Sequence, residues 1–206
     1  MDQTLQEFSE ALASAAPTPG GGGAAAVMGA IGAALGAMAA RLSARRKTCA
    51  GNADELTHMV ERCEALRLRF LNGIEADAAA FLPLAAAYRI PKEAPGREET
   101  LRRASLDACS AAMEMLRLCA VTAGLLVRLK DCASPLLLSD VGCAAAACRG
   151  ALLSASYNIF VNTKSYADDE EAQGLNAAAK ALMQDALPKL EDVELQVLLA
   201  LQGEEV

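Results

Sequence analysis

Two aspartates are candidates for acid/base chemistry because each lies beside a stretch that is almost free of charge. Asp77 occurs in IEADAAAFLPLAAA, and Asp140 follows Ser139 immediately before VGCAAAACRGALLSASYNIFVNTK. A carboxylate in apolar surroundings costs free energy unless it is paired, or unless it faces a cleft where it can transfer a proton. For Asp77 the alternatives are a buried ion pair with an arginine such as Arg97, or a carboxylate that faces a cleft and serves acid/base chemistry or a cationic substrate. For Asp140 they are a helix N-cap or a site residue.

Polar side chains recur along the alanine-rich stretch that follows Asp140. Ser154, Asn158 and Asn162 are spaced four residues apart and therefore form a stripe on one helix face, whereas Arg149 falls on the opposite face. Such a stripe either bonds to neighbouring backbone or lines a cleft. Asp140 and Asn158 lie on one face but roughly 27 Å apart. We therefore expect them to contact different parts of a long ligand, or different sites across a dimer.

A run of four glycines, residues 20–23, opens the most unusual segment, PTPGGGGAAAVMGAIGAALGAMAARLS. It predicts a glycine-rich loop that leads into a helix, whose free N–H groups favour an anion. The run lacks the Lys-Ser/Thr of a phosphate-binding loop and has no strand before it. Four glycines exceed what a turn requires, so Gly21, Gly22 and Gly23 are candidates for close approach to a ligand or to a second chain.

A basic cluster, Arg45, Arg46 and Lys47, follows the end of that segment. One interpretation is that these cations complement the negative C-terminal end of a helix. The other is that they bind the anionic tail of a ligand. The residues alone leave both alternatives open.

Composition limits the class of protein. The chain has 206 residues, which suits one domain spanning 1–206. It is 53% hydrophobic but only 3% aromatic and lacks Trp, so its core must be built from small aliphatic side chains. The net charge of −7 argues against nucleic-acid binding.

Cysteine and histidine usage argues against a metal site. Seven cysteines occur without a C-x-x-C pair, which indicates reduced, buried thiols and a cytoplasmic protein. The acidic N-terminus has no signal-peptide character, which agrees with that location. The one histidine, His58, lies among charged residues, and we expect it on the surface rather than in a catalytic or zinc site.

The elements that must position these residues are all helical. The apolar segment 17–43 is long enough to span a membrane, but it is rich in Ala and Gly, and no second charge-free span exists to pair with it. We therefore expect a buried helix and no membrane contact. The predicted fold is an all-α bundle of six to seven helices, several of them long, around this central Ala/Gly-rich helix. The other helices are expected at about 2–14, 53–88, 97–130, 139–164, 168–186 and 188–201.

Several segments together resemble the C-terminal family of formiminotransferase-cyclodeaminases, which includes free-standing methenyltetrahydrofolate cyclohydrolases. The proline-glycine opening is the most specific of them, and Ala24 stands where the family has Ser. The matching segments, in family order, are PTPGGGGAAAVMGAIGAALGAMAARLS, DAAAF (77–81), AYRIPK (87–92) with Arg97 beyond it, SDVGCAA (139–145) and SYNIFVN (156–162).

The resemblance implies a homodimer that acts on tetrahydrofolate one-carbon adducts without metal, nucleotide or other cofactor. A cyclohydrolase adds water to the 5,10-methenyl bridge, and a cyclodeaminase closes 5-formimino-tetrahydrofolate to that bridge with release of ammonia. In this interpretation Asp77 and Asp140 are the acid/base candidates. The basic cluster would bind the glutamate carboxylates, and Asn158 and Asn162 would bond the pterin or the partner chain. The alternative is a non-catalytic folate-binding or helical interaction protein.

Overall fold

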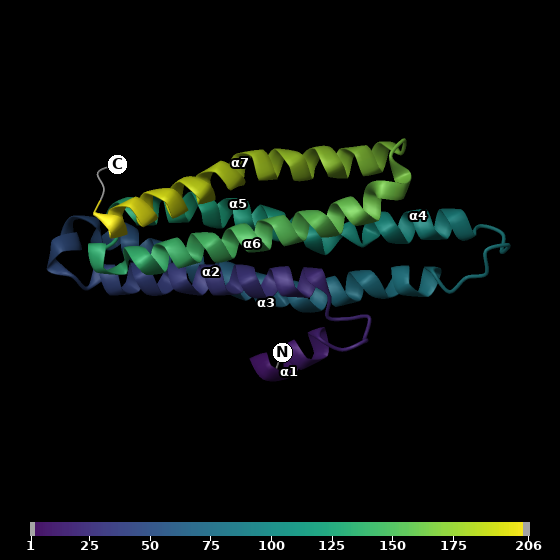
Figure 1. Cartoon of the computed structure of the whole chain (residues 1–206), viewed down its shortest axis with the longest axis horizontal. Helices are drawn as coiled ribbons and strands as arrows, with labels where there is room; N and C mark the ends of the chain where they lie inside the picture. Colours follow the sequence, from purple (N-terminus) through teal and green to yellow (C-terminus); the bar gives the residue numbers. More distant parts are fainter. Residues whose placement is uncertain (1–2, 204–206) are drawn as a thin grey trace.

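The computed structural model describes residues 3–203 as a bundle of seven α-helices and three short 3₁₀ helices, and this part of the chain contains no strand. The predicted all-α bundle is therefore confirmed. Five long helices run side by side along the molecule, and α1 lies on the outside (Figure 1). The helices are α1 (Leu5–Leu12), α2 (Gly21–Ala44), α3 (Ala53–Ala87), α4 (Arg97–Asp107), α5 (Cys109–Cys132), α6 (Leu138–Thr163) and α7 (Glu170–Gln202), with 3₁₀ helices η1 (Lys47–Asn52), η2 (Pro135–Leu137) and η3 (Lys164–Tyr166).

The central helix is α2, which packs most extensively against α3 and α6. Its glycines allow this close packing. A Cβ atom on Gly29 would lie 2.4 Å from Phe70, and one on Gly32 would lie 3.0 Å from the Ala144 carbonyl oxygen. Larger side chains would push the neighbouring helices apart. The expected glycine-rich loop is wrong in one respect, because only Gly20 precedes the helix and α2 itself begins at Gly21.

Length and hydropathy alone do not distinguish a membrane protein from a bundle. Four helical segments of the described chain, those that include α2, α3, α5 and α6, are long and apolar enough to cross a membrane by these two measures. The segment that contains α2 differs from the other three in its long run without charge, which extends to residue 40. Of the most apolar window of α2, 61% is buried inside the bundle.

Two helix boundaries differ from the sequence-based expectation. The helix expected over 97–130 is interrupted at Ala108, which separates α4 from α5. Conversely, Pro188 does not start a new helix but lies inside α7. It is exposed, so water can hydrate the carbonyl that loses its N–H partner, and Figure 1 shows α7 bending along its course.

The first helix, α1, begins with a capping box in which the Thr4 hydroxyl accepts from the Glu7 N–H and the Glu7 carboxylate accepts from the Thr4 N–H. The predicted start of this helix, Asp2, lies outside the described residues. Phe8 of α1 is buried, whereas Leu5 is 69% exposed. Phe8 reaches the start of α2, where a Cβ on Gly23 would lie 3.7 Å from its ring. α1 therefore covers the end of α2 that carries the glycine run.

The residues that the sequence places away from the candidate site lie away from it in the structure. His58 is on the surface, with its side chain 69% exposed and its Nδ1 3.7 Å from Glu61. Arg149 faces α7 and pairs with Glu194 at 2.8 Å, away from the polar stripe. All seven cysteines are free, and all except Cys143 are buried.

Candidate active site

The first turn of α2 and the C-terminal third of α3 meet at Gly22 and Asp77. A Cβ atom on Gly22 would lie 1.9 Å from Oδ1 of Asp77 and 2.4 Å from its Cγ, which are impossible contacts. Glycine at position 22 is thus what allows the carboxylate to lie directly against the start of the central helix. Backbone amides at a helix start favour a carboxylate, and Gly23 offers one to Asp77.

The protonation of Asp77 is set mainly by its surroundings. Burial raises the pKa of its carboxyl above the usual range, and the hydrogen bond from the Gly23 backbone opposes this shift only in part. The half-buried carboxyl therefore keeps its proton up to a higher pH than an exposed aspartate would.

The interpretation of Asp77 as half of a buried ion pair is wrong. Arg97, the suggested partner, donates from Nε to the Ile90 carbonyl oxygen at 2.8 Å. No charged group contributes to the pKa shift of Asp77, and no ion pair joins it to another described residue. Of the two alternatives, the structure favours a carboxylate that faces a cleft.

That cleft is a cavity of about 170 Å³ between the start of α2, the C-terminal third of α3 and the end of α6. It brings together four groups predicted from the sequence, Asp77, Gly21, Gly22 and the amide pair Asn158/Asn162. It also contains residues that sequence analysis did not select. The full lining is Pro17, Thr18, Gly20, Gly21, Gly22, Asp77, Phe81, Ala108, Asn158, Val161 and Asn162.

Two asparagines of α6 line the same cavity as Asp77. Asn158 donates from Nδ2 to the Ser154 carbonyl oxygen at 2.8 Å, which fixes the orientation of its amide and leaves Oδ1 for a ligand. A Cβ on Gly21 would lie 3.4 Å from the same Nδ2, so this amide also packs on the first turn of α2. Asn162 lies beside Cys109, a thiol whose pKa burial raises to about 11. The thiol therefore stays protonated, and Asp77 remains the acid/base candidate among the residues that line the cavity.

Asp140 and Ser139 lie elsewhere. The N-cap prediction for Asp140 is wrong, because α6 begins at Leu138 and its N-cap is Leu137. No side chain forms a capping hydrogen bond at this helix start. Asp140 instead occupies the first turn, where a negative charge complements the helix dipole. Since Asn158 lines the cavity and is roughly 27 Å away along α6, Asp140 and Ser139 do not share the cavity with Asp77 in one chain.

The basic cluster is also remote from Asp77. Arg45, Arg46 and Lys47 are exposed around a shallow hollow of about 420 Å³ at the far end of α2. This helix has 24 residues, so its ends are roughly 36 Å apart. That exceeds what a pterin, an aminobenzoyl ring and a single glutamate span together. In one chain, the cluster and Asp77 cannot bind the two ends of such a ligand.

An all-α bundle that holds an unpaired, half-buried carboxyl and two amides against the first turn of its central helix has the features of an enzyme for a small molecule that needs proton transfer. Among the described residues no group of three or more His, Cys, Asp or Glu is arranged to hold a metal ion. The formiminotransferase-cyclodeaminase family model matches residues 4–181, and the chain belongs to this family.

Individual relatives agree with the family assignment. A methenyltetrahydrofolate cyclohydrolase of Methylorubrum extorquens is 33% identical over 88% of this chain and 92% of its own. A formimidoyltransferase-cyclodeaminase of Rattus norvegicus is 26% identical over 90% of this chain but only 35% of its own, so the chain spans about a third of that relative. The crystal structure of a formiminotetrahydrofolate cyclodeaminase from Thermotoga maritima matches with a TM-score of 0.84 at 26% identity, covering 98% of this chain and 97% of the other.

Proposed function

We propose that the protein is a folate one-carbon enzyme that acts at the bridge between N5 and N10 of tetrahydrofolate, and that it is a methenyltetrahydrofolate cyclohydrolase. The observation that carries the proposal is the Asp77 carboxyl held against Gly22 in a cavity with Asn158 and Asn162. The hydrolytic reaction is favoured because the relative of that name matches at 33% identity over nearly the whole of both chains.

In the proposed mechanism the cationic methenyl carbon lies beside Asp77. The carboxylate stabilises this cation and accepts a proton from the water that attacks the carbon. The product of this step is a tetrahedral carbon that carries a hydroxyl group between N5 and N10. Asp77 then returns the proton to N5 as the bond between N5 and this carbon breaks, and the hydroxyl loses its proton to become the carbonyl of 10-formyl-tetrahydrofolate. The sum is methenyl cation plus water giving the formyl product and one proton.

The two amides suit the polar edges of such a substrate. Asn158 has a carbonyl oxygen that its bond to Ser154 leaves unused, and the amide of Asn162 also lines the cavity, so both can bond the ring nitrogens of a pterin. Phe81 supplies an apolar wall. We propose no metal and no cofactor in the reaction, and a cytoplasmic location.

The test is turnover of two substrates by the purified protein. Loss of the methenyl absorbance of 5,10-methenyl-tetrahydrofolate above the spontaneous rate would support the cyclohydrolase. Its appearance from 5-formimino-tetrahydrofolate would instead identify a cyclodeaminase, the activity named for the Thermotoga maritima structure. No enzymatic change in either direction, with tetrahydrofolate still raising the melting temperature, would identify a non-catalytic folate-binding protein.

We also propose that the protein is a homodimer, and the support is the exposed face formed by α2 and α6. Ile31 on α2 is 46% exposed, and Tyr157 and Val161 on α6 are 63% and 66% exposed. Apolar groups on a face next to the site cavity fit a second copy better than solvent. An antiparallel partner is also what would bring the basic cluster near a bound folate. Ile31→Glu should convert a dimer to a monomer in sedimentation velocity, and a wild-type protein that sediments as a monomer would refute the proposal.

A further inference from the structure

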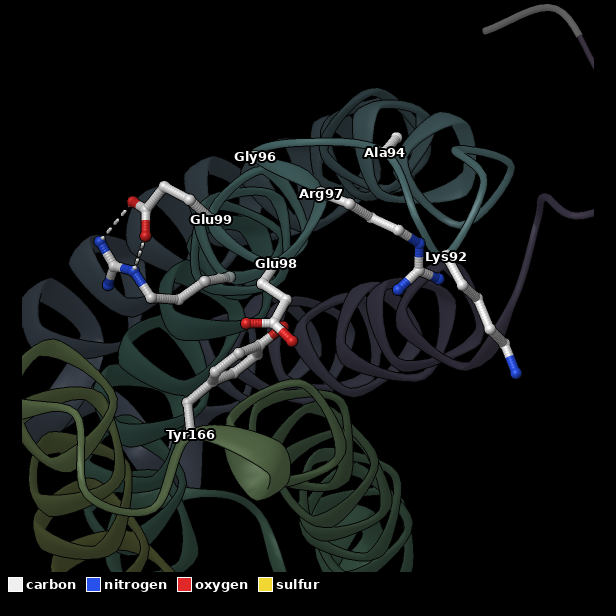
Figure 2. A pocket seen from close by; sticks show the side chains of 8 residues that line it. Lys92, Ala94, Gly96, Arg97, Glu98, Glu99 and Tyr166 are labelled. Atoms are coloured by element: carbon white, nitrogen blue, oxygen red, sulfur yellow. Dashed lines mark hydrogen bonds and ion pairs between the residues drawn. The ribbon is translucent and has the colours of Figure 1, made fainter.

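A second cavity, of about 610 Å³, lies at the end of the bundle where α4 begins. Its walls come from the 88–96 connection, the first turn of α4 and η3. Figure 2 shows Lys92 and Arg97 extending on one side of this cavity, with Glu99 on the opposite side and Tyr166 below. The lining residues are Lys92, Ala94, Gly96, Arg97, Glu98, Glu99, Arg102 and Tyr166.

The cations of this cavity differ in whether their charge is already neutralised. Arg102 bonds both carboxylate oxygens of Glu99, at 3.0 and 3.1 Å, and pairs with Asp169 at 2.8 Å. Arg97, by contrast, uses only Nε, on the carbonyl oxygen of Ile90. Its two terminal nitrogens and the Lys92 ammonium have no carboxylate within ion-pair distance in the described part of the chain. These two cations are therefore available to an anionic ligand.

One carboxylate of the cavity opposes this charge. Glu98 is exposed and forms no ion pair with another described residue. Once the ion pairs of Arg102 are set aside, the cavity has, among the described residues, two unpaired cations, Lys92 and Arg97, and one unpaired carboxylate, Glu98. Its remaining net charge is therefore positive. Figure 2 shows the Glu98 side chain on the Tyr166 side of the cavity, away from Lys92.

The second cavity lies further along the same two helical segments that line the candidate active site. On α6 the active-site cavity is lined by Asn158 and Asn162, and the next turn brings Tyr166 to the second cavity. The other shared wall is α4, because Ala108 after its last residue lines the active-site cavity and Arg97 at its start lines the second. The 11 residues of α4 span roughly 16 Å, and Asn158 to Tyr166 spans roughly 12 Å. An extended aminobenzoyl-glutamate reaches about this far from N10.

We propose that Lys92 and Arg97 form the subsite for the glutamate carboxylates of the folate whose one-carbon group lies beside Asp77. The inference rests on the proposed function, since it takes the ligand from it. In this proposal the glutamate of the folate is bound by the same chain that binds its one-carbon group. The basic cluster at 45–47, by contrast, could reach that glutamate only from the second subunit of a dimer. Arg97 is held by its bond to Ile90 and can form a bidentate contact, and Lys92 adds a mobile charge.

The experiment compares two stable ligands by titration calorimetry with the full chain. One is 5-formyl-tetrahydrofolate and the other is 5-formyl-tetrahydropteroate, which lacks the glutamate. Lys92→Gln should weaken binding of the first about 3- to 10-fold at low ionic strength, and less in high salt, because the cation is exposed. Binding of the pteroate should change less than about twofold. Lys180→Gln, an exposed lysine on α7, is the matched control and should change neither.

Each other result has a definite meaning. An equal effect of Lys92→Gln on both ligands, or no effect on either, overturns the subsite. A glutamate-dependent loss in Lys47→Gln but not in Lys92→Gln also overturns it and places the tail at the basic cluster. If wild-type protein turns over its substrate in these cases, the proposed function stands without the subsite. If wild-type protein neither binds 5-formyl-tetrahydrofolate nor turns over a substrate, both proposals fail.

Discussion

Replacement of Gly22 by alanine tests the geometry of the site without removing any functional group. The new Cβ would lie 1.9 Å from Oδ1, 2.4 Å from Cγ and 2.6 Å from Oδ2 of Asp77. Either the Asp77 side chain rotates away or α2 and α3 separate. Both displace the carboxyl by more than an ångström relative to the cavity, and a displacement of that size costs about 100-fold in rate.

The expected effect of Gly22→Ala on stability is much smaller. Overpacking costs about 1–3 kcal/mol, and the higher helix propensity of alanine returns up to about 1 kcal/mol. The net loss of about 0–3 kcal/mol corresponds to a melting temperature lowered by at most about 12 °C for a chain of this size. We therefore expect a folded protein whose kcat/KM for methenyl-tetrahydrofolate falls about 100-fold.

Two other glycines provide matched controls. Gly174 lies inside α7 with no atom within 4 Å of an added Cβ, so Gly174→Ala should be stable and fully active. Gly29 lies on α2, and its Cβ would meet Phe70 at 2.4 Å. Gly29→Ala should therefore lower the melting temperature at least as much as Gly22→Ala but should leave the rate of the folded protein within a few-fold.

A double variant decides whether Gly22→Ala acts through Asp77. If it does, Gly22→Ala combined with Asp77→Asn should be no slower than Asp77→Asn alone, because the carboxyl is already absent. Two independent losses that multiply in the double variant would refute the reasoning. So would a Gly22→Ala protein with wild-type activity.

Two further predictions concern single side chains. Asp77→Asn should lower kcat about 10²- to 10⁴-fold. Burial raises the folded-state pKa of Asp77, so this carboxyl favours folding most at pH values below its unfolded pKa of about 3.9, and that contribution is lost as the pH rises through the folded pKa. Asp77→Asn should therefore remove this pH dependence. Compared with the wild type, the variant should gain more melting temperature at pH 7 than at pH 4, and thermal unfolding of both proteins at both pH values measures this. His58→Gln should leave kcat/KM within about twofold and the unfolding free energy within about 0.5 kcal/mol, since this histidine is exposed and far from the cavity; a larger loss in the turnover assay would contradict its surface role.

The fold was largely predictable because composition and periodicity act over many residues. A chain with 3% aromatic residues and long runs of alanine can fill its core only through close helix contacts. Helix boundaries were less predictable because they depend on one or two residues in tertiary context. Pro188 stays inside α7 because its site is exposed. The interruption at Ala108 was not predicted because no Gly or Pro lies at that position or next to it.

The site was predictable in its residue types but not in its grouping. Asp77 was identifiable as a charge in an apolar segment, and its glycine partner as a run too long for a turn. No local pattern states that Gly22 and Asp77 touch, since they are 55 positions apart in the chain. Asp140 carried the same local signal as Asp77 and lies at the other end of α6. The packing of α2 against α3 and α6, which the sequence does not show, is what distinguishes the two aspartates, because it places Asp77 and not Asp140 beside the start of α2.

The glycine run links the fold to the chemistry. The same absence of side chains that lets α2 pack closely at Gly29 and Gly32 lets Asp77 approach its first turn at Gly22. A side chain at position 22 would displace the carboxyl from its place against the helix start, because its Cβ would overlap the carboxyl atoms of Asp77. The helix start supplies one amide, from Gly23, which holds the carboxylate without neutralising it. Burial and the amide therefore act on the pKa of this carboxyl in opposite directions, and burial has the larger effect.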